Sequence, residues 1–126
     1  MTELKPGLTG TAATIVRETN TAIAMGSGDL QVFATPCMVA LMEQAACNAV
    51  ADCFDDATSS VGTLINVTHD AATTLGKNVT ATATLVEVAG RKLVFEVTAA
   101  DEDKQIGKGR HERFIINKEK FMAKLG

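Results

Sequence analysis

The sequence predicts an α+β protein in which one long helix is wrapped by a curved antiparallel β-sheet. Three observations lead to this prediction. A single strand-like segment comes first, and residues 36–53 then form a helix that is apolar on nearly every side. Four segments that alternate apolar with polar or small residues follow this helix. A helix that is apolar all round needs cover on several sides, which a single curled sheet can provide.

The first predicted elements are a strand and a loop. Residues 8–16, LTGTAATIV, are rich in threonine and β-branched residues, as strands are. The segment NTAIAMGSGDLQ, residues 20–31, contains a Gly-Ser-Gly-Asp cluster that marks a loop. This loop lies just before the helix, where a flexible cover could sit over the helix entrance.

The long helix is predicted from its start signal and its apolar pattern. Thr35 is a good N-cap, and Pro36 suits the first helical position because its missing N–H would be unpaired there. The helix is expected to end near Cys53 or Phe54. Its first four turns hold one charged residue, Glu43, and a carboxylate in apolar surroundings is costly without a partner. Glu43 is therefore either a catalytic carboxylate or part of a structural ion pair, for which Arg113 is a candidate.

Four strands are predicted after the loop at residues 55–60. They comprise residues 61–69, 78–88, 93–100 and 106–117. Turn signals between them lead us to expect successive antiparallel pairing. A sheet of this kind has free edges, and the helical layer is only one helix thick, so the pattern favours a homodimer.

The composition is that of one globular domain, residues 1–126, with 46% hydrophobic residues. The net charge of −3 gives no electrostatic reason to propose a nucleic acid or an anionic membrane as partner. The N-terminus lacks the pattern of a signal peptide, and no apolar run is long enough to span a membrane. Cys37, Cys47 and Cys53 are expected to be small buried side chains of a reducing cytoplasm. A nucleophilic role for Cys37 at the helix start is an alternative.

Several residues could carry chemistry. Thr35 precedes Glu43 by a little over two helical turns, so both can lie on nearly the same face. Thr35 is either a plain N-cap or a group that works with the unpaired helix-start amides on a developing oxyanion. His69 ends a strand and is either a general base or a structural residue. His111, flanked by charges in GRHER, is expected on a solvated strand. The histidines and Glu43 lack metal-site spacing, and no phosphate-binding glycine loop is present.

Four separated segments resemble the hotdog-fold acyl-CoA thioesterases, with the closest likeness to the fluoroacetyl-CoA thioesterase branch. The segments are FATPCMVALME, VGTLINVTHDAATTLG, GRKLVFEVTAAD and IGKGRHERFIINKEKF. The resemblance implies a hotdog fold and a homodimer with active sites at the subunit interface. It also implies catalytic roles for Thr35, Glu43 and His69. Phe33, Gly62 and Arg113 are expected to bind the substrate.

The resulting prediction is a thioesterase that hydrolyses an acyl-CoA to a free acid and a thiol, without a metal or redox cofactor. A hotdog hydratase or dehydratase, and a non-catalytic acyl-CoA-binding module, are the alternatives. The fluoroacetyl branch carries phenylalanines that form a hydrophobic lid before the helix, and Gly26 and Asp29 stand at those positions here. This departure predicts no strong preference for fluoroacetyl-CoA over acetyl-CoA.

Overall fold

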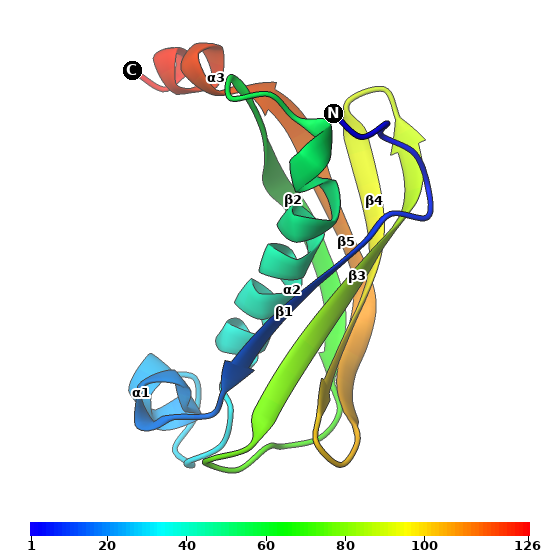
Figure 1. Ribbon diagram of the computed structural model, residues 1–126. Coiled ribbons are helices and arrows are strands. Elements are labelled where there is room, and N and C mark those ends of the chain that lie inside the picture. The colour runs from blue at the N-terminus through cyan, green and yellow to red at the C-terminus, as the bar shows by residue number, and fades with distance from the viewer.

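A five-stranded antiparallel sheet curls around the long helix α2 (Thr35–Val50), as Figure 1 shows. The computed structural model describes residues 1–126. The strands are β1 (Thr9–Ile15), β2 (Thr58–His69), β3 (Asn78–Ala89), β4 (Lys92–Asp101) and β5 (Gln105–Asn117). Two short helices, α1 (Ala22–Met25) and α3 (Lys118–Lys124), complete the fold. The predicted α+β architecture is confirmed.

The order of the strands differs in one respect from the predicted succession. The sheet runs β1-β3-β4-β5-β2, so β3, β4 and β5 pair in sequence as expected, whereas β2 pairs with β5 and not with β3. Residues 70–77 carry the chain from β2 across the end of the sheet to β3 (Figure 1). As a result β1 and β2 form the two edges, and β2 presents an unpaired backbone edge.

The core lies between α2 and the concave face of the sheet. The helix packs chiefly against β1 and β3, and small side chains allow a very close approach. At Gly10 in β1, a Cβ atom would lie 2.3 Å from the carbonyl oxygen of Ala45, so a larger residue would push the strand off the helix. The helical residues buried in this core are Met38, Leu41, Met42, Ala45, Ala46, Ala49 and Val50.

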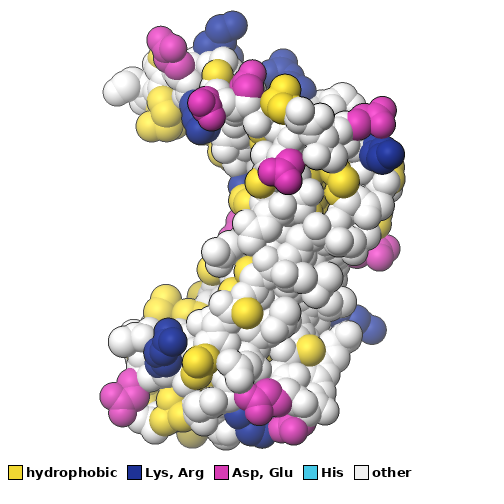
Figure 2. Space-filling model, in the orientation of Figure 1, with side chains coloured by type: hydrophobic (Ala, Val, Ile, Leu, Met, Phe, Trp, Pro, Cys, Tyr) yellow, Lys and Arg dark blue, Asp and Glu magenta, His cyan; other side chains and the backbone are white.

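The opposite side of α2 is open, which corrects the expectation that the curled sheet covers the apolar helix on several sides. Ala40, Gln44 and Cys47 are exposed there, and the space-filling view shows the molecule hollowed between its α1 and α3 ends (Figure 2). The prediction of three buried cysteines is also wrong, because Cys37 and Cys53 are only half-buried and Cys47 is exposed. The physical reason is that a single sheet covers only one side of the helix.

The ends of the helix also differ from the prediction. The helix begins at Thr35, one residue early, and Ala34 is the N-cap without a side-chain hydrogen bond. The predicted N-cap role of Thr35 is therefore wrong, and its hydroxyl is free for another partner. The helix ends at Val50 and is followed by a 3₁₀ turn, Ala51–Cys53. None of the helices combines the length and apolar character needed to cross a membrane.

Candidate active site

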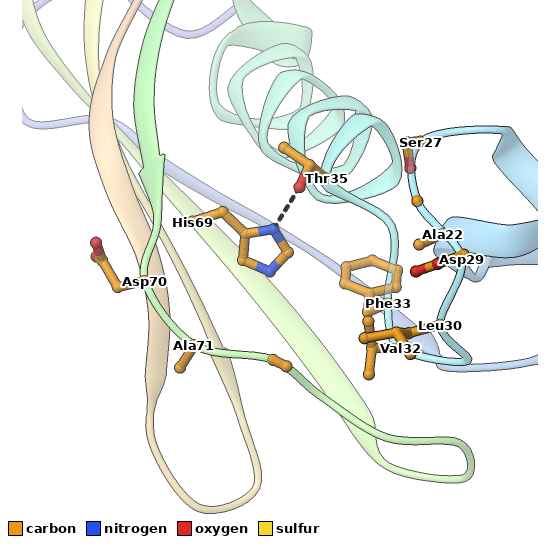
Figure 3. A pocket seen from close by; sticks show the side chains of 12 residues that line it. Ala22, Ser27, Asp29, Leu30, Val32, Phe33, Thr35, His69, Asp70 and Ala71 are labelled. Carbon is orange, nitrogen blue, oxygen red and sulfur yellow. Dashed lines mark hydrogen bonds between the residues drawn. The ribbon is translucent and has the colours of Figure 1, made fainter.

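Thr35 and His69 meet at the entrance of α2. Thr35 is the first residue of the helix and His69 is the last residue of β2, and the Thr35 Oγ1 atom lies 2.7 Å from His69 Nδ1. Figure 3 shows the hydroxyl and the imidazole ring facing each other. A hydroxyl within hydrogen-bond reach of a histidine is a recurring arrangement in hydrolytic sites, where the second ring nitrogen remains available.

The His69 ring is held in a form that can accept a proton. Burial lowers the pKa of His69 below its ordinary value of 6.5, and the charge of Asp70 and the backbone of Ala71 oppose this only in part. The ring is therefore neutral at neutral pH. Its Nε2 atom is buried and has no hydrogen-bond partner within the protein. A buried polar atom of this kind is a natural contact for a substrate or a reacting water molecule.

The Thr35–His69 pair lines a cavity of about 320 Å³. One side of the cavity is formed by the lid segment, residues 22–32, which contains α1 and the loop that follows it. The other side is formed by residues 69–72 at the end of β2. Phe33 is 1% exposed and also lines the cavity, and its role in binding the substrate stays a prediction. Figure 3 shows the lid residues facing the imidazole across this space.

A hydrogen-bonded anchor fixes the two sides of the cavity relative to each other. The Phe33 backbone N–H donates to the Thr73 carbonyl at 2.8 Å, and the Thr73 hydroxyl donates to Asp101 Oδ2 at 2.8 Å. Burial alone would raise the pKa of Asp101, but hydrogen bonds from Lys104, from the Asp103 backbone and from Thr73 hold it well below its usual range. The ionised carboxylate thus ties the loop after His69 to the β4–β5 turn.

The start of α2 offers fewer free amides than expected. Pro36 has no N–H, and the N–H groups of Cys37 and Met38 both donate to the Ala34 carbonyl. The Thr35 N–H makes no such backbone bond, and Thr35 lies at the helix end that borders the cavity. One backbone donor therefore remains for a substrate oxygen. Cys37 is a poor candidate nucleophile, since burial raises the pKa of its thiol above the ordinary 9.0.

Glu43, Gly62 and Arg113 form a second cluster further along the helix. Arg113 Nη1 lies 3.5 Å from Glu43 Oε2, and the arginine side chain is 8% exposed while that of Glu43 is 41% exposed. Glu43 and Gly62 line a cavity of about 190 Å³. At Gly62 a Cβ atom would lie only 2.8 Å from Glu43 Oε2. Glu43 is thus half-exposed and ion-paired, and not deeply buried as its apolar neighbours in sequence indicated.

The two clusters are separate within one chain. Thr35 and Glu43 are eight residues apart on the same helix, which corresponds to about 12 Å along its axis. The structure therefore brings Thr35, His69 and Phe33 together, and it places Glu43, Gly62 and Arg113 together elsewhere. The catalytic roles of all these residues stay predictions. No group of three or more His, Cys, Asp or Glu side chains lies close enough together to bind a metal ion.

Sequence reasoning missed His111. The prediction of a solvated strand position is wrong, because His111 is 1% exposed and lines the cavity that contains Glu43. Strand alternation was the available signal. In GKGRHER, the glycines, His111 and Arg113 fall on one face, while Lys108, Arg110 and Glu112 fall on the other. The charged neighbours of His111 in sequence therefore point away from it in space.

The family profile described as fluoroacetyl-CoA-specific thioesterase matches residues 16–119. The fluoroacetyl-CoA thioesterase of Streptantibioticus cattleyicolor is 50% identical over 95 residues, which are 75% of this chain and 68% of that enzyme.

Solved structures agree with this match. The structure of the fluoroacetyl-CoA thioesterase FlK has a TM-score of 0.92 at 39% identity and covers 98% of this chain and 96% of its own. A phenylalanine-to-alanine variant of FlK, in complex with fluoroacetate and CoA, has a TM-score of 0.85 at 40% identity and covers 94% and 99%. A hot-dog-like protein from Thermanaerovibrio acidaminovorans has a TM-score of 0.85 at 22% identity over 95% and 89% of the two chains, which shows the fold alone.

Proposed function

Since this chain belongs to the fluoroacetyl-CoA-specific thioesterase family, whose members are hotdog-fold acyl-CoA thioesterases, we propose that it hydrolyses the thioester of a small acyl group at the Thr35–His69 cavity. The 2.7 Å contact between Thr35 Oγ1 and His69 Nδ1 carries this proposal. The Nε2 atom of this neutral imidazole is buried without a partner, and the cavity that His69 lines can accommodate a small acyl group.

The proposed reaction uses His69 to move one proton. Thr35 accepts a hydrogen bond from His69 Nδ1–H, which leaves Nε2 unprotonated and able to accept a proton. A water proton passes to Nε2 while the thioester carbonyl is attacked, and the Thr35 N–H donates to the carbonyl oxygen as it becomes negative. The C–S bond then breaks, and the imidazolium returns its proton to the leaving thiolate. The products are the free acid and the thiol, and His69 is neutral again.

We propose further that the protein is a homodimer joined along β2. This strand is twelve residues long, lies at the edge of the sheet, and exposes Leu64 and Ile65. The open side of α2 lies next to it (Figures 1 and 2). Two copies related by a two-fold axis would pair these strands antiparallel. The His69 end of one strand then runs alongside the Gly62 end of the other.

This dimer would complete the site with Glu43 of the partner subunit. Within one chain Glu43 is about 12 Å from Thr35 along the helix, too far to act on the same carbonyl. Across the antiparallel strands, its half-exposed carboxylate would face the Thr35–His69 pair. There it would direct the attacking water or attack the carbonyl carbon itself to form an anhydride that water cleaves. Single-turnover hydrolysis in ¹⁸O-labelled water detects the anhydride route when water attacks its Glu43 side, because the label then enters the glutamate and the product acid stays unlabelled.

Subunit complementation tests both the reaction and the shared site. Thr35→Val and Glu43→Gln should each lose most thiol release from acetyl-CoA. If the two variants are mixed and allowed to exchange subunits, half of the dimers are mixed, and each mixed dimer has one site without a substitution. We expect recovery of about a quarter of the unmodified activity. No recovery despite proven exchange would contradict a shared site. Substrate binding without thiol release by the unmodified protein would favour the binding-module or hydratase alternatives.

The three unpaired cysteines support a cytoplasmic location for this enzyme. Free thiols persist in a reducing compartment, and Cys47 is exposed to the solvent. We therefore propose that the protein acts in the cytoplasm on acyl-CoA substrates. Fractionation of cells that express a tagged protein from its own promoter would test this, and recovery in an oxidising compartment would contradict it.

A further inference from the structure

His111 is the one buried histidine that the proposed reaction does not use. It lies on β5 with its ring against Phe95, at a centroid separation of 6.1 Å. Its Nδ1 atom is 2.8 Å from the Leu64 carbonyl oxygen, and a carbonyl can only accept, so Nδ1 carries the hydrogen. Its Nε2 atom is 3.2 Å from Arg113 Nη1, and a guanidinium can only donate, so Nε2 accepts. These two contacts determine one neutral tautomer.

Each nitrogen of the Arg113 guanidinium contacts a polar atom of the protein. Its Nε donates to the Ser60 hydroxyl and its Nη2 donates to the Ser60 carbonyl, each at 2.8 Å. The remaining nitrogen, Nη1, lies between His111 Nε2 and the Glu43 carboxylate. The imidazole is therefore the acceptor that fixes the one guanidinium nitrogen that also faces Glu43.

We propose that His111 is a positioning residue for thioester hydrolysis, which orients Arg113 so that the Glu43 carboxylate is held opposite Gly62. This inference rests on the proposed role of Glu43. His111 does not contact the reacting atoms in this account and acts through the guanidinium. Its chemical requirement is specific: the ring must offer an acceptor at the Nε2 position, and hydrogen-bond donation at that position would turn Arg113 away.

The surroundings of His111 favour the neutral form. Burial lowers the pKa of His111, and the Leu64 carbonyl and Glu43 oppose this while Arg113 adds to it. Arg113 approaches from β5 and Glu43 from α2, whereas the contact from β2 is the Leu64 backbone and the contact from β4 is the ring of Phe95. Protonation would place a second cation beside Arg113 and remove the acceptor at the same time.

A matched pair of variants tests the role of the acceptor. In His111→Gln, the side-chain oxygen can occupy the Nε2 position and accept from Arg113, whereas His111→Asn reaches only the Nδ1 position. Both variants lose the same ring, so their melting temperatures should fall by similar amounts. We expect His111→Gln to retain kcat for acetyl-CoA within about threefold, and His111→Asn to lose at least about tenfold in kcat with little change in KM.

Equal kcat values for the two variants would overturn the proposal, whether both are high or both are low. If neither variant folds, ¹⁵N NMR of the two histidine rings in the unmodified enzyme decides, with His69 identified by its substitution. A His111 ring protonated at Nδ1 supports the proposal, and one protonated at Nε2 overturns it. Glu43→Gln belongs in the same series. Full kcat in that variant would refute the role of Glu43, and with it this inference. If kcat falls in Glu43→Gln but not in His111→Asn, only the role of His111 is refuted.

Discussion

Replacing Gly62 by alanine should impair the reaction without unfolding the protein. The added Cβ would lie 2.8 Å from Glu43 Oε2, about 0.6 Å short of ordinary contact. His111 Cε1 at 3.3 Å and Arg113 Nη1 at 3.4 Å close the neighbouring directions, so the carboxylate has to leave its place. A misplacement approaching 1 Å costs up to about a hundredfold in rate. We therefore expect kcat to fall by about 10- to 100-fold, or about 1.4 to 2.7 kcal/mol in activation free energy.

The stability of Gly62→Ala should change in the opposite sense or hardly at all. Gly62 does not adopt a positive φ angle, so alanine fits the backbone, and the less flexible unfolded chain favours folding by up to about 1 kcal/mol. Thiol release from acetyl-CoA and thermal unfolding should be measured on one preparation, with Ser59→Ala on the same strand as control. Unchanged kcat in a folded Gly62→Ala protein would show that the position of Glu43 does not matter. A loss of several kcal/mol in stability would show that the packing around Gly62 is misjudged.

Three further predictions concern charge, substrate and pH. Glu43→Gln should reduce thiol release by at least about a hundredfold. The melting temperature should change little, because Arg113 keeps both of its hydrogen bonds to Ser60. A variant that melts early but has a normal kcat would show that Glu43 is a structural residue. The ratio of kcat/KM for fluoroacetyl-CoA to that for acetyl-CoA should stay below about a hundred, or about 2.7 kcal/mol, and a larger ratio would place the discriminating element outside the lid segment. Both histidines have lowered pKa values in the folded protein, so the unfolded chain takes up protons first as the pH falls. The free energy of unfolding should therefore fall as the pH drops below about 6.5. Equal free energies of unfolding from denaturant titrations at pH 7.5 and 5.5 would contradict this.

The sequence predicted the layers of the fold better than its edges. The apolar period of residues 36–53 and the alternation of the later strands are local signals, and both correspond to observed elements. The pairing of β2 with β5 is not local, because it depends on how a curled sheet closes against the helix. The short helices α1 and α3 escaped prediction since each is too short to show an apolar period.

For the site, sequence reasoning identified residue types and missed their spatial grouping. Thr35 and Glu43 share a helix, which encouraged the idea of one site, but the rise of the helix separates them and the strand end brings His69 to Thr35 alone. His111 was misplaced because its charged neighbours in sequence lie on the other face of β5. Distances of this kind are set by the tertiary fold, which a linear pattern does not contain.

The lid segment is attached to the protein almost entirely at its ends. Bridges between Thr21 and Phe33 and between Val32 and Thr74 fasten it there, whereas the residues between them expose Ile23, Met25 and Leu30 to the solvent. Mutations in this stretch can therefore accumulate without loosening α2 or the sheet. During evolution a gene of this kind can keep Thr35 and His69 unchanged while the cover over them diverges. Descendants with different acyl preferences would then arise by drift in one surface loop, at little risk to folding.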